Sequence, residues 1–137
     1  MLALEKTGRW SKEGARILIR AGYKCEYCGL DFFASPSNYR LWQLDHIVPV
    51  KHYGPDVFDN YAASCYPCNS IYKNQWDPRK VAGADASRDE LIEATRKHIA
   101  QGRKADEGVI AEDRRLIGWE AKEDERSPAI LPAPSQY

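Results

Sequence analysis

The amino-acid sequence predicts an α+β fold in which short helices and strands surround two cysteine-containing turns. Three observations support this fold class. Apolar residues in residues 12–21 recur at helical spacing, residues 40–48 have the composition of a β-strand, and four cysteines occur as two close pairs. The chain has 137 residues, of which 43% are apolar, so it is long enough for one domain with a modest core.

The cysteines form two Cys-x-x-Cys pairs, Cys25/Cys28 and Cys65/Cys68, separated by 36 residues. Two such pairs are a common source of four thiolates for a tetrahedral Zn²⁺ ion. Four thiolates leave no coordination position for a substrate, so the predicted zinc site is structural. Two redox-active pairs or unrelated buried thiols are alternatives, but a redox motif needs a single pair beside a βαβ pattern, which the sequence lacks. Zinc would close residues 26–66 into a loop.

Turn and capping signals place the elements of the N-terminal half. Ser11 and Gly22 are suitable first and last caps for the helix at residues 12–21. The strand at residues 40–48 ends before Pro49. We predict a short helical turn at residues 60–64 and a helix at residues 69–76.

The C-terminal half is predicted to be helical. Ser87 and Glu90 form a capping box for a helix that starts at residue 88 and ends near Gly102. A second, charged helix is predicted at residues 104–126. These elements suggest a domain at residues 1–80, a helical extension at 81–126 that packs on or beside it, and a flexible proline-rich tail at 127–137.

Charge gives little indication of the partner. Lys and Arg number 20, Asp and Glu number 20, and the net charge is zero. Residues 1–80 carry 11 basic and 8 acidic residues, whereas residues 81–137 carry 9 and 12. No apolar run approaches the roughly 18 residues that span a bilayer, and the N-terminus lacks the apolar core of a signal peptide. We therefore expect a cytoplasmic protein without membrane contact, in which thiols stay reduced.

An ionisable pair, Asp45 and His46, interrupts the apolar run Leu44–Pro49. Burying such a pair costs free energy unless it has partners, so it requires a role. Histidine accepts protons near neutral pH, and carboxylate and amide oxygens are ligands for hard divalent cations. Asn60 and Asn69 lie close to the second cysteine pair, so zinc could bring their side chains near Asp45 and His46.

This arrangement resembles the HNH endonuclease family, whose zinc-containing members read Cys-x-x-Cys, then Asp-His-Ile-x-Pro, then Asn, then Cys-x-x-Cys-His. The resemblance covers about residues 23–76 and rests on both cysteine pairs, Asp45–Pro49 and Asn60. It implies a ββα-metal (His-Me finger) core, flanked here by an N-terminal helix and C-terminal helices. It also implies metal-dependent cleavage of nucleic acid.

The resemblance assigns a role to each matching residue. His46 matches the general base, Asp45 and Asn69 match the divalent-metal ligands, and Asn60 matches the middle asparagine. Asn69 replaces the last histidine of the motif, which favours Mg²⁺ or Mn²⁺. Many members have a lysine three residues after that histidine. Here Tyr72 has that position and Lys73 follows it, so Lys73 is a candidate phosphate contact together with Arg16 and Arg20, which share a helical face.

The sequence leaves several alternatives open. Asp45 and His46 are also compatible with a buried structural pair, and Asn60 and Asn69 with helix caps. The main functional hypothesis is a DNA endonuclease, with RNA open as a substrate. The alternative is a zinc-bound module that binds nucleic acid or protein without catalysis. Residues 88–126 are a candidate surface for a protein partner, and the sequence does not indicate an oligomeric state.

Overall fold

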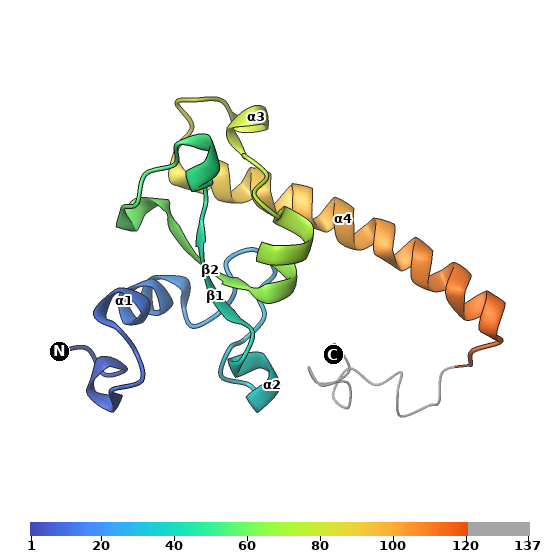
Figure 1. Ribbon diagram of the computed structural model, residues 1–137, viewed down its shortest axis with the longest axis horizontal. Coiled ribbons are helices and arrows are strands. Elements are labelled where there is room, and N and C mark those ends of the chain that lie inside the picture. Colours follow the sequence, from blue (N-terminus) through green and yellow to red (C-terminus); the bar gives the residue numbers. More distant parts are fainter. Residues whose placement is uncertain (121–137) are drawn as a thin grey trace.

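The computed structural model describes residues 1–120 and confirms a mixed α+β fold (Figure 1). Two antiparallel strands lie at its centre, with helices around them. The helices and strands are α1 (Lys12–Ala21), α2 (Pro36–Tyr39), β1 (Trp42–His46), β2 (Tyr61–Cys65), the π-helix η4 (Pro67–Lys73), α3 (Arg79–Ala82) and α4 (Arg88–Ile117), with 3-10 turns at Glu5–Thr7, Val50–His52 and Phe58–Asn60.

Strands β1 and β2 form a short hairpin-like pair in which Trp42 lies opposite Cys65 and His46 lies opposite Tyr61. The predicted helical turn at residues 60–64 was therefore wrong. All five residues of β2 are buried, and its alanines have no strong preference for a strand. Pairing with β1 and packing on both faces decide the conformation, which local composition cannot reveal.

Helix α1 begins and ends where its caps predict. The Ser11 hydroxyl accepts a hydrogen bond from the Gly14 amide, and Gly22 adopts a left-handed conformation with φ of 66°. Ile17 and Leu18 are fully buried and belong to the same core cluster as Ala62 and Ala63 of β2. Helix α1 thus covers one side of the strand pair.

Helix α4 is one continuous helix, so the predicted end at Gly102 was wrong. The capping box of Ser87 and Glu90 is confirmed at its start. Gly102 lies inside the helix, and a Cβ there would lie 2.8 Å from the Tyr72 ring, so this close approach accounts for the glycine. The predicted helix at residues 104–126 is the continuation of α4 as far as Ile117. Its residues after 120 and the predicted tail at 127–137 lie outside the described residues.

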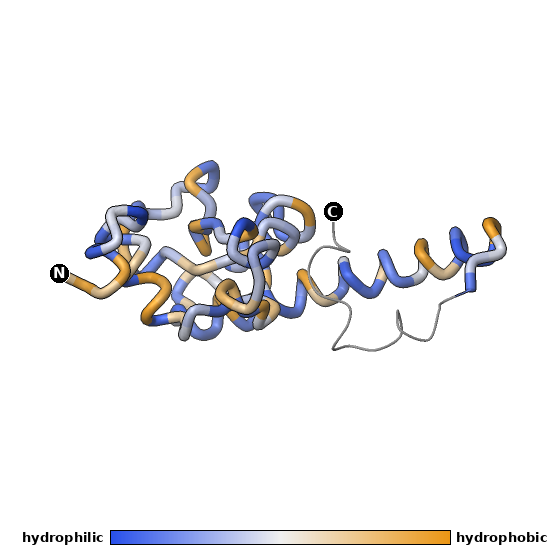
Figure 2. Tube along the Cα trace, turned by 90° about the horizontal axis from the view of Figure 1, so that it is seen from below, coloured by the Kyte–Doolittle hydropathy of each residue, from blue (hydrophilic) through white to orange (hydrophobic). Residues whose placement is uncertain are grey.

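The two halves of α4 have different surroundings. Ile92, Thr95 and Ile99 are buried, and α4 contacts the π-helix η4. From Lys104 onward every described residue is exposed, and the helix extends away from the rest of the molecule (Figure 1). Hydrophilic and hydrophobic residues alternate along this outer part (Figure 2). Within residues 1–120, no helix is long and apolar enough to cross a membrane.

Two glycines of α4 provide a matched test of this packing. Gly108→Ala should stabilise the protein by about 1 kcal/mol, because alanine favours the helix and nothing lies within 4 Å of the new Cβ. Gly102→Ala should be less stable than Gly108→Ala, because Tyr72 must move. Urea unfolding of both variants measures the difference, and equal stabilisation would contradict the proposed role of Gly102.

Candidate functional site

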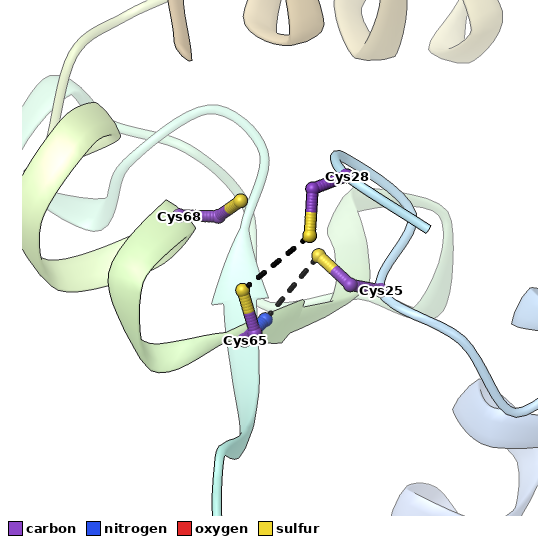
Figure 3. A group of neighbouring side chains, drawn as sticks. All are labelled: Cys25, Cys28, Cys65 and Cys68. Atoms are coloured by element: carbon purple, nitrogen blue, oxygen red, sulfur yellow. Dashed lines mark hydrogen bonds between the residues drawn. The ribbon is translucent and has the colours of Figure 1, made fainter. Parts of the chain in front are cut away.

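The four cysteines come together from three segments of the chain. Cys25 and Cys28 lie on the loop after α1, Cys65 ends β2, and Cys68 lies in η4 (Figure 3). Their sulfur atoms all lie within 4.8 Å of one another, and the Cys28 and Cys65 sulfurs are 3.7 Å apart. A tetrahedral site with Zn–S bonds of about 2.3 Å has sulfurs about 3.8 Å apart. The cluster is thus compatible with a structural zinc ion.

The thiols cannot all ionise without a cation. Hydrogen bonds from neighbouring thiols, that of Cys28 first, lower the pKa of Cys25, whereas the hydrogen bond with Cys25 is the main cause that raises the pKa of Cys65 and of Cys68. Zinc binding would therefore release protons from the cluster. One guanidinium already faces the sulfurs, because Arg103 of α4 donates to Cys68 Sγ at 3.2 Å.

A polar cleft of about 350 Å³ is lined by several of the residues that the sequence analysis singled out. It contains the end of β1, the exposed side of η4 and the loop that follows Pro49. The residues that line the cleft are Leu44, Asp45, His46, Pro49, Val50, Lys51, Asn69, Ser70, Lys73, Asn74 and Gln75. Asp45, His46, Asn69 and Lys73 therefore meet at one cavity.

The imidazole of His46 is held by a carboxylate. Its Nε2 atom lies 2.9 Å from Oδ1 of Asp56. The Tyr61 hydroxyl donates to the same oxygen, and the hydrogen bonds from Tyr61 and His46 lower the pKa of Asp56. The ionised carboxylate accepts a hydrogen bond from Nε2–H, which leaves Nδ1 as the ring nitrogen that can accept a proton.

The carboxylate of Asp45 is buried and has two partners. The Tyr27 hydroxyl donates to Oδ2 at 2.5 Å, and Lys73 Nζ lies 3.2 Å from the same oxygen. Burial raises the pKa of Asp45 and lowers the pKa of Lys73, and the charge of each group opposes the shift of the other. Among residues 1–120, Oδ1 has only a long contact, 3.4 Å from Lys73 Nζ. Oδ1 therefore has fewer and longer polar contacts than Oδ2.

The side chain of Asn69 is oriented by Gln43. Asn69 Nδ2 donates to Gln43 Oε1 at 2.8 Å, and the Ser70 hydroxyl donates to the same oxygen. Because the amide nitrogen is used in this way, the Asn69 oxygen remains as an acceptor at the cleft.

Asn60 connects the two ends of the loop between Val48 and Pro55. Its side-chain oxygen accepts from the Val48 amide, and its nitrogen donates to the carbonyls of Val48 and Pro55. The loop also needs a glycine at residue 54, where a Cβ would lie 1.7 Å from the Val48 carbonyl oxygen. These contacts position Asp56, the partner of His46.

Comparison with known families agrees with this geometry. The family model described as HNH endonuclease matches residues 25–75. Residues 25–75 are thus similar to the HNH endonuclease domain. No curated protein and no solved structure matches the chain significantly. The HNH domain indicates a nuclease or a nucleic-acid-binding function, and HNH nucleases act on DNA.

The π-helix η4 carries both Asn69 and Lys73. A step of four residues makes slightly more than one turn of an α-helix and slightly less than one turn of the wider π-helix. In both cases the side chains of the two residues lie near the same face. Within η4, Lys73 shares the cleft with Asn69. Its side chain is 1% exposed, and its ammonium also donates to the His46 carbonyl at 3.2 Å. Lys73 is thus held inside the molecule and not at its surface.

The arginines of α1 have other contacts. Arg20 donates to the carbonyl oxygens of Phe58 and Tyr61. Its guanidinium also lies 3.9 Å from the centre of the Phe58 ring, and that of Arg16 lies 4.2 Å from it. Arg20 therefore connects α1 to the start of β2. Arg16 remains exposed on the same face.

Four residues of the site were not found from the sequence, namely Tyr27, Gln43, Asp56 and Tyr61. Gln43 precedes Asp45 by two residues on a strand, so period-2 alternation places both side chains on one face. That signal was available. Asp56 is different, because only the path of the loop after Gly54 brings it to His46.

Removal of the Arg103 guanidinium should weaken zinc binding. Arg103→Ala should release zinc to a chelator severalfold faster than the wild type, because the cluster loses the cation beside Cys68. Arg115→Ala removes an exposed arginine from the same helix and serves as the control. Equal release rates for the two variants, followed with a chromogenic chelator, would show that Arg103 does not support the cluster.

Proposed function

We propose that this protein is a metal-dependent HNH endonuclease that hydrolyses phosphodiester bonds in DNA. The observation that carries the proposal is the pairing of His46 with Asp56 at a cleft that also holds Asp45 and Asn69. A base held by a carboxylate, next to two oxygen ligands, is the group of residues that phosphodiester hydrolysis requires.

In this proposal His46 is the general base. Asp56 fixes the tautomer and the orientation of the ring, so that Nδ1 takes a proton from a water molecule. The resulting hydroxide attacks phosphorus, the bond to the leaving oxygen breaks, and that oxygen takes a proton from solvent. Asn60 acts indirectly, because it holds the loop that carries Asp56.

Asp45 Oδ1 and the Asn69 side-chain oxygen are the proposed ligands for Mg²⁺ or Mn²⁺. Both are hard oxygen donors at the cleft, and neither oxygen has a short hydrogen bond among the described residues. When bound, the divalent ion would neutralise phosphate charge and stabilise the leaving oxygen. Lys73 adds a positive charge behind these ligands, and Arg16 is a candidate contact for a more distant phosphate. Reduced thiols at the zinc cluster fit a cytoplasmic location.

One observation favours the alternative, a zinc-bound module that binds nucleic acid or protein without cutting. The Lys73 ammonium lies 3.2 Å from Asp45 Oδ2 and thus already compensates the charge of that carboxylate. A lysine that takes the place of a divalent ion would leave the cleft without a means to activate the phosphate. The alternative predicts DNA or protein binding and no nicking in any divalent metal.

Nicking of supercoiled plasmid decides between the two. The zinc-loaded protein should convert plasmid to the open circle in Mg²⁺ or Mn²⁺ but not in EDTA. His46→Ala should lose this activity by at least about a thousandfold, because the base is absent, while its fold and zinc content stay unchanged. Undiminished nicking by His46→Ala would eliminate His46 as the base, and no nicking by the folded wild type would favour the binding module.

The partner of His46 has a test of its own. Asp56→Asn should lower the nicking rate by about ten- to a hundredfold, because the amide no longer holds the imidazole as an ionised carboxylate does. Asp59→Asn changes an exposed carboxylate on the same segment and should keep the wild-type rate. Wild-type activity of Asp56→Asn would mean that Asp56 has no role in positioning His46.

A further inference from the structure

A second hollow lies beside the cleft and is different in character. It has a volume of about 650 Å³ and lies between the first turn of α1 and the start of β1. Its lining residues are Arg9, Trp10, Ser11, Glu13, Gly14, Tyr39, Arg40, Trp42 and Leu44. We call it the aromatic groove because three of these residues have large aromatic rings. Its size is in the range of small-ligand sites.

The rings of the aromatic groove support one another. The ring centre of Trp10 lies 5.9 Å from that of Tyr39 and 5.7 Å from that of Trp42. Trp42 in turn contacts the buried ring of Phe32 edge to face. Each of these three residues is half-buried, so part of its surface is packed and part is accessible to solvent. Rings fixed before a ligand arrives need little ordering when it binds.

The aromatic groove and the proposed catalytic cleft share one lining residue. Leu44 lines both hollows. Trp42, Leu44 and His46 alternate along β1, so their side chains lie on one face of the strand. Four residues of a strand span roughly 13 Å. A ligand in the aromatic groove would therefore lie a short distance along β1 from the imidazole of His46.

The charges at the rim favour an anionic ligand. Arg9 and Arg40 are exposed, and the guanidinium of Arg40 lies 5.7 Å from the centre of the Tyr39 ring. Glu13 is the acidic residue among those that line the hollow. The lining thus has two positive charges, one negative charge and three aromatic rings. Arginines beside aromatic rings form the combination that binds single-stranded nucleic acid, in which bases stack and phosphates pair with cations.

We propose that the aromatic groove binds an unpaired base of the DNA strand that the cleft cuts, with Arg9 and Arg40 on its flanking phosphates. This proposal rests on the proposed function and names its substrate class, which is DNA with a single-stranded segment next to the scissile bond. A base inside a duplex is stacked and paired, so its face is not available to the rings. The groove would therefore select against fully paired DNA.

Binding to labelled oligonucleotides tests the proposal without any need for cleavage. The zinc-loaded His46→Ala protein is titrated, by fluorescence anisotropy, into a fluorescein-labelled single strand. The same strand paired with its complement and a strand of abasic sites of equal charge serve as comparisons. The unpaired strand should bind about tenfold more tightly than either, because only it offers free base faces. Equal affinity for all three would overturn the proposal.

Protein variants in the His46→Ala background locate the contact. Arg40→Ala should weaken binding of the single strand severalfold, whereas Arg115→Ala, at the far end of α4, should not. Trp10→Leu should remove most of the preference for the single strand over the abasic strand. A preference that persists in a folded Trp10→Leu protein would place the bases elsewhere and overturn the proposal. If that variant does not fold, Arg40→Ala and the abasic strand decide in its place.

Failure of this proposal can be distinguished from failure of the proposed function. If the preference for the single strand depends on the aromatic groove but the wild type does not nick DNA, the binding proposal stands and the catalytic proposal is refuted. If the protein nicks DNA in a metal-dependent way but shows no preference for unpaired DNA, the catalytic proposal stands and the binding proposal is refuted.

Discussion

The cluster of four cysteines is the constraint on which the other parts of the site depend. It connects the loop after α1, the end of β2 and the start of η4. Closing the chain between the two cysteine pairs into a loop costs conformational entropy. A zinc ion, if bound, would supply folding free energy to offset that cost. Because Cys65 and Cys68 flank the turn between β2 and η4, the cluster also fixes the angle at which η4 presents Asn69.

Buried polar pairings then set the geometry of the cleft. Asp45 and Lys73 are almost fully buried, and an isolated charge at either position would be strongly destabilising. Their pairing, completed by the Tyr27 hydroxyl, keeps both charges beside the cleft. The buried side chain of Asn60 likewise holds the two ends of the loop between Val48 and Pro55. These contacts are costly for a small domain, which suggests that function rather than stability accounts for them.

The sequence predicted the parts that depend on local chemistry. Capping residues located α1 and the start of α4, and the spacing of Cys25, Cys28, Cys65 and Cys68 predicted the cluster. The motif around Asp45 and His46 indicated Asn69 and Lys73, which line the cleft with them, and Asn60, which does not line it. The sequence could not predict β2, whose alanines become a strand only by pairing with β1. It also could not predict that α4 continues through Gly102, a glycine that lies against the ring of Tyr72, or that Asp56 reaches His46 across a loop.

A crystal structure of the zinc-loaded protein grown with Mn²⁺ would test the central claim most directly, because anomalous scattering distinguishes and locates both metals. The account predicts a zinc peak among the four sulfurs and a manganese peak bonded to Asp45 Oδ1 and the Asn69 oxygen, with His46 still held by Asp56. A cleft without manganese, with the Lys73 ammonium still paired with Asp45, would contradict the metal-dependent mechanism and support a binding module instead.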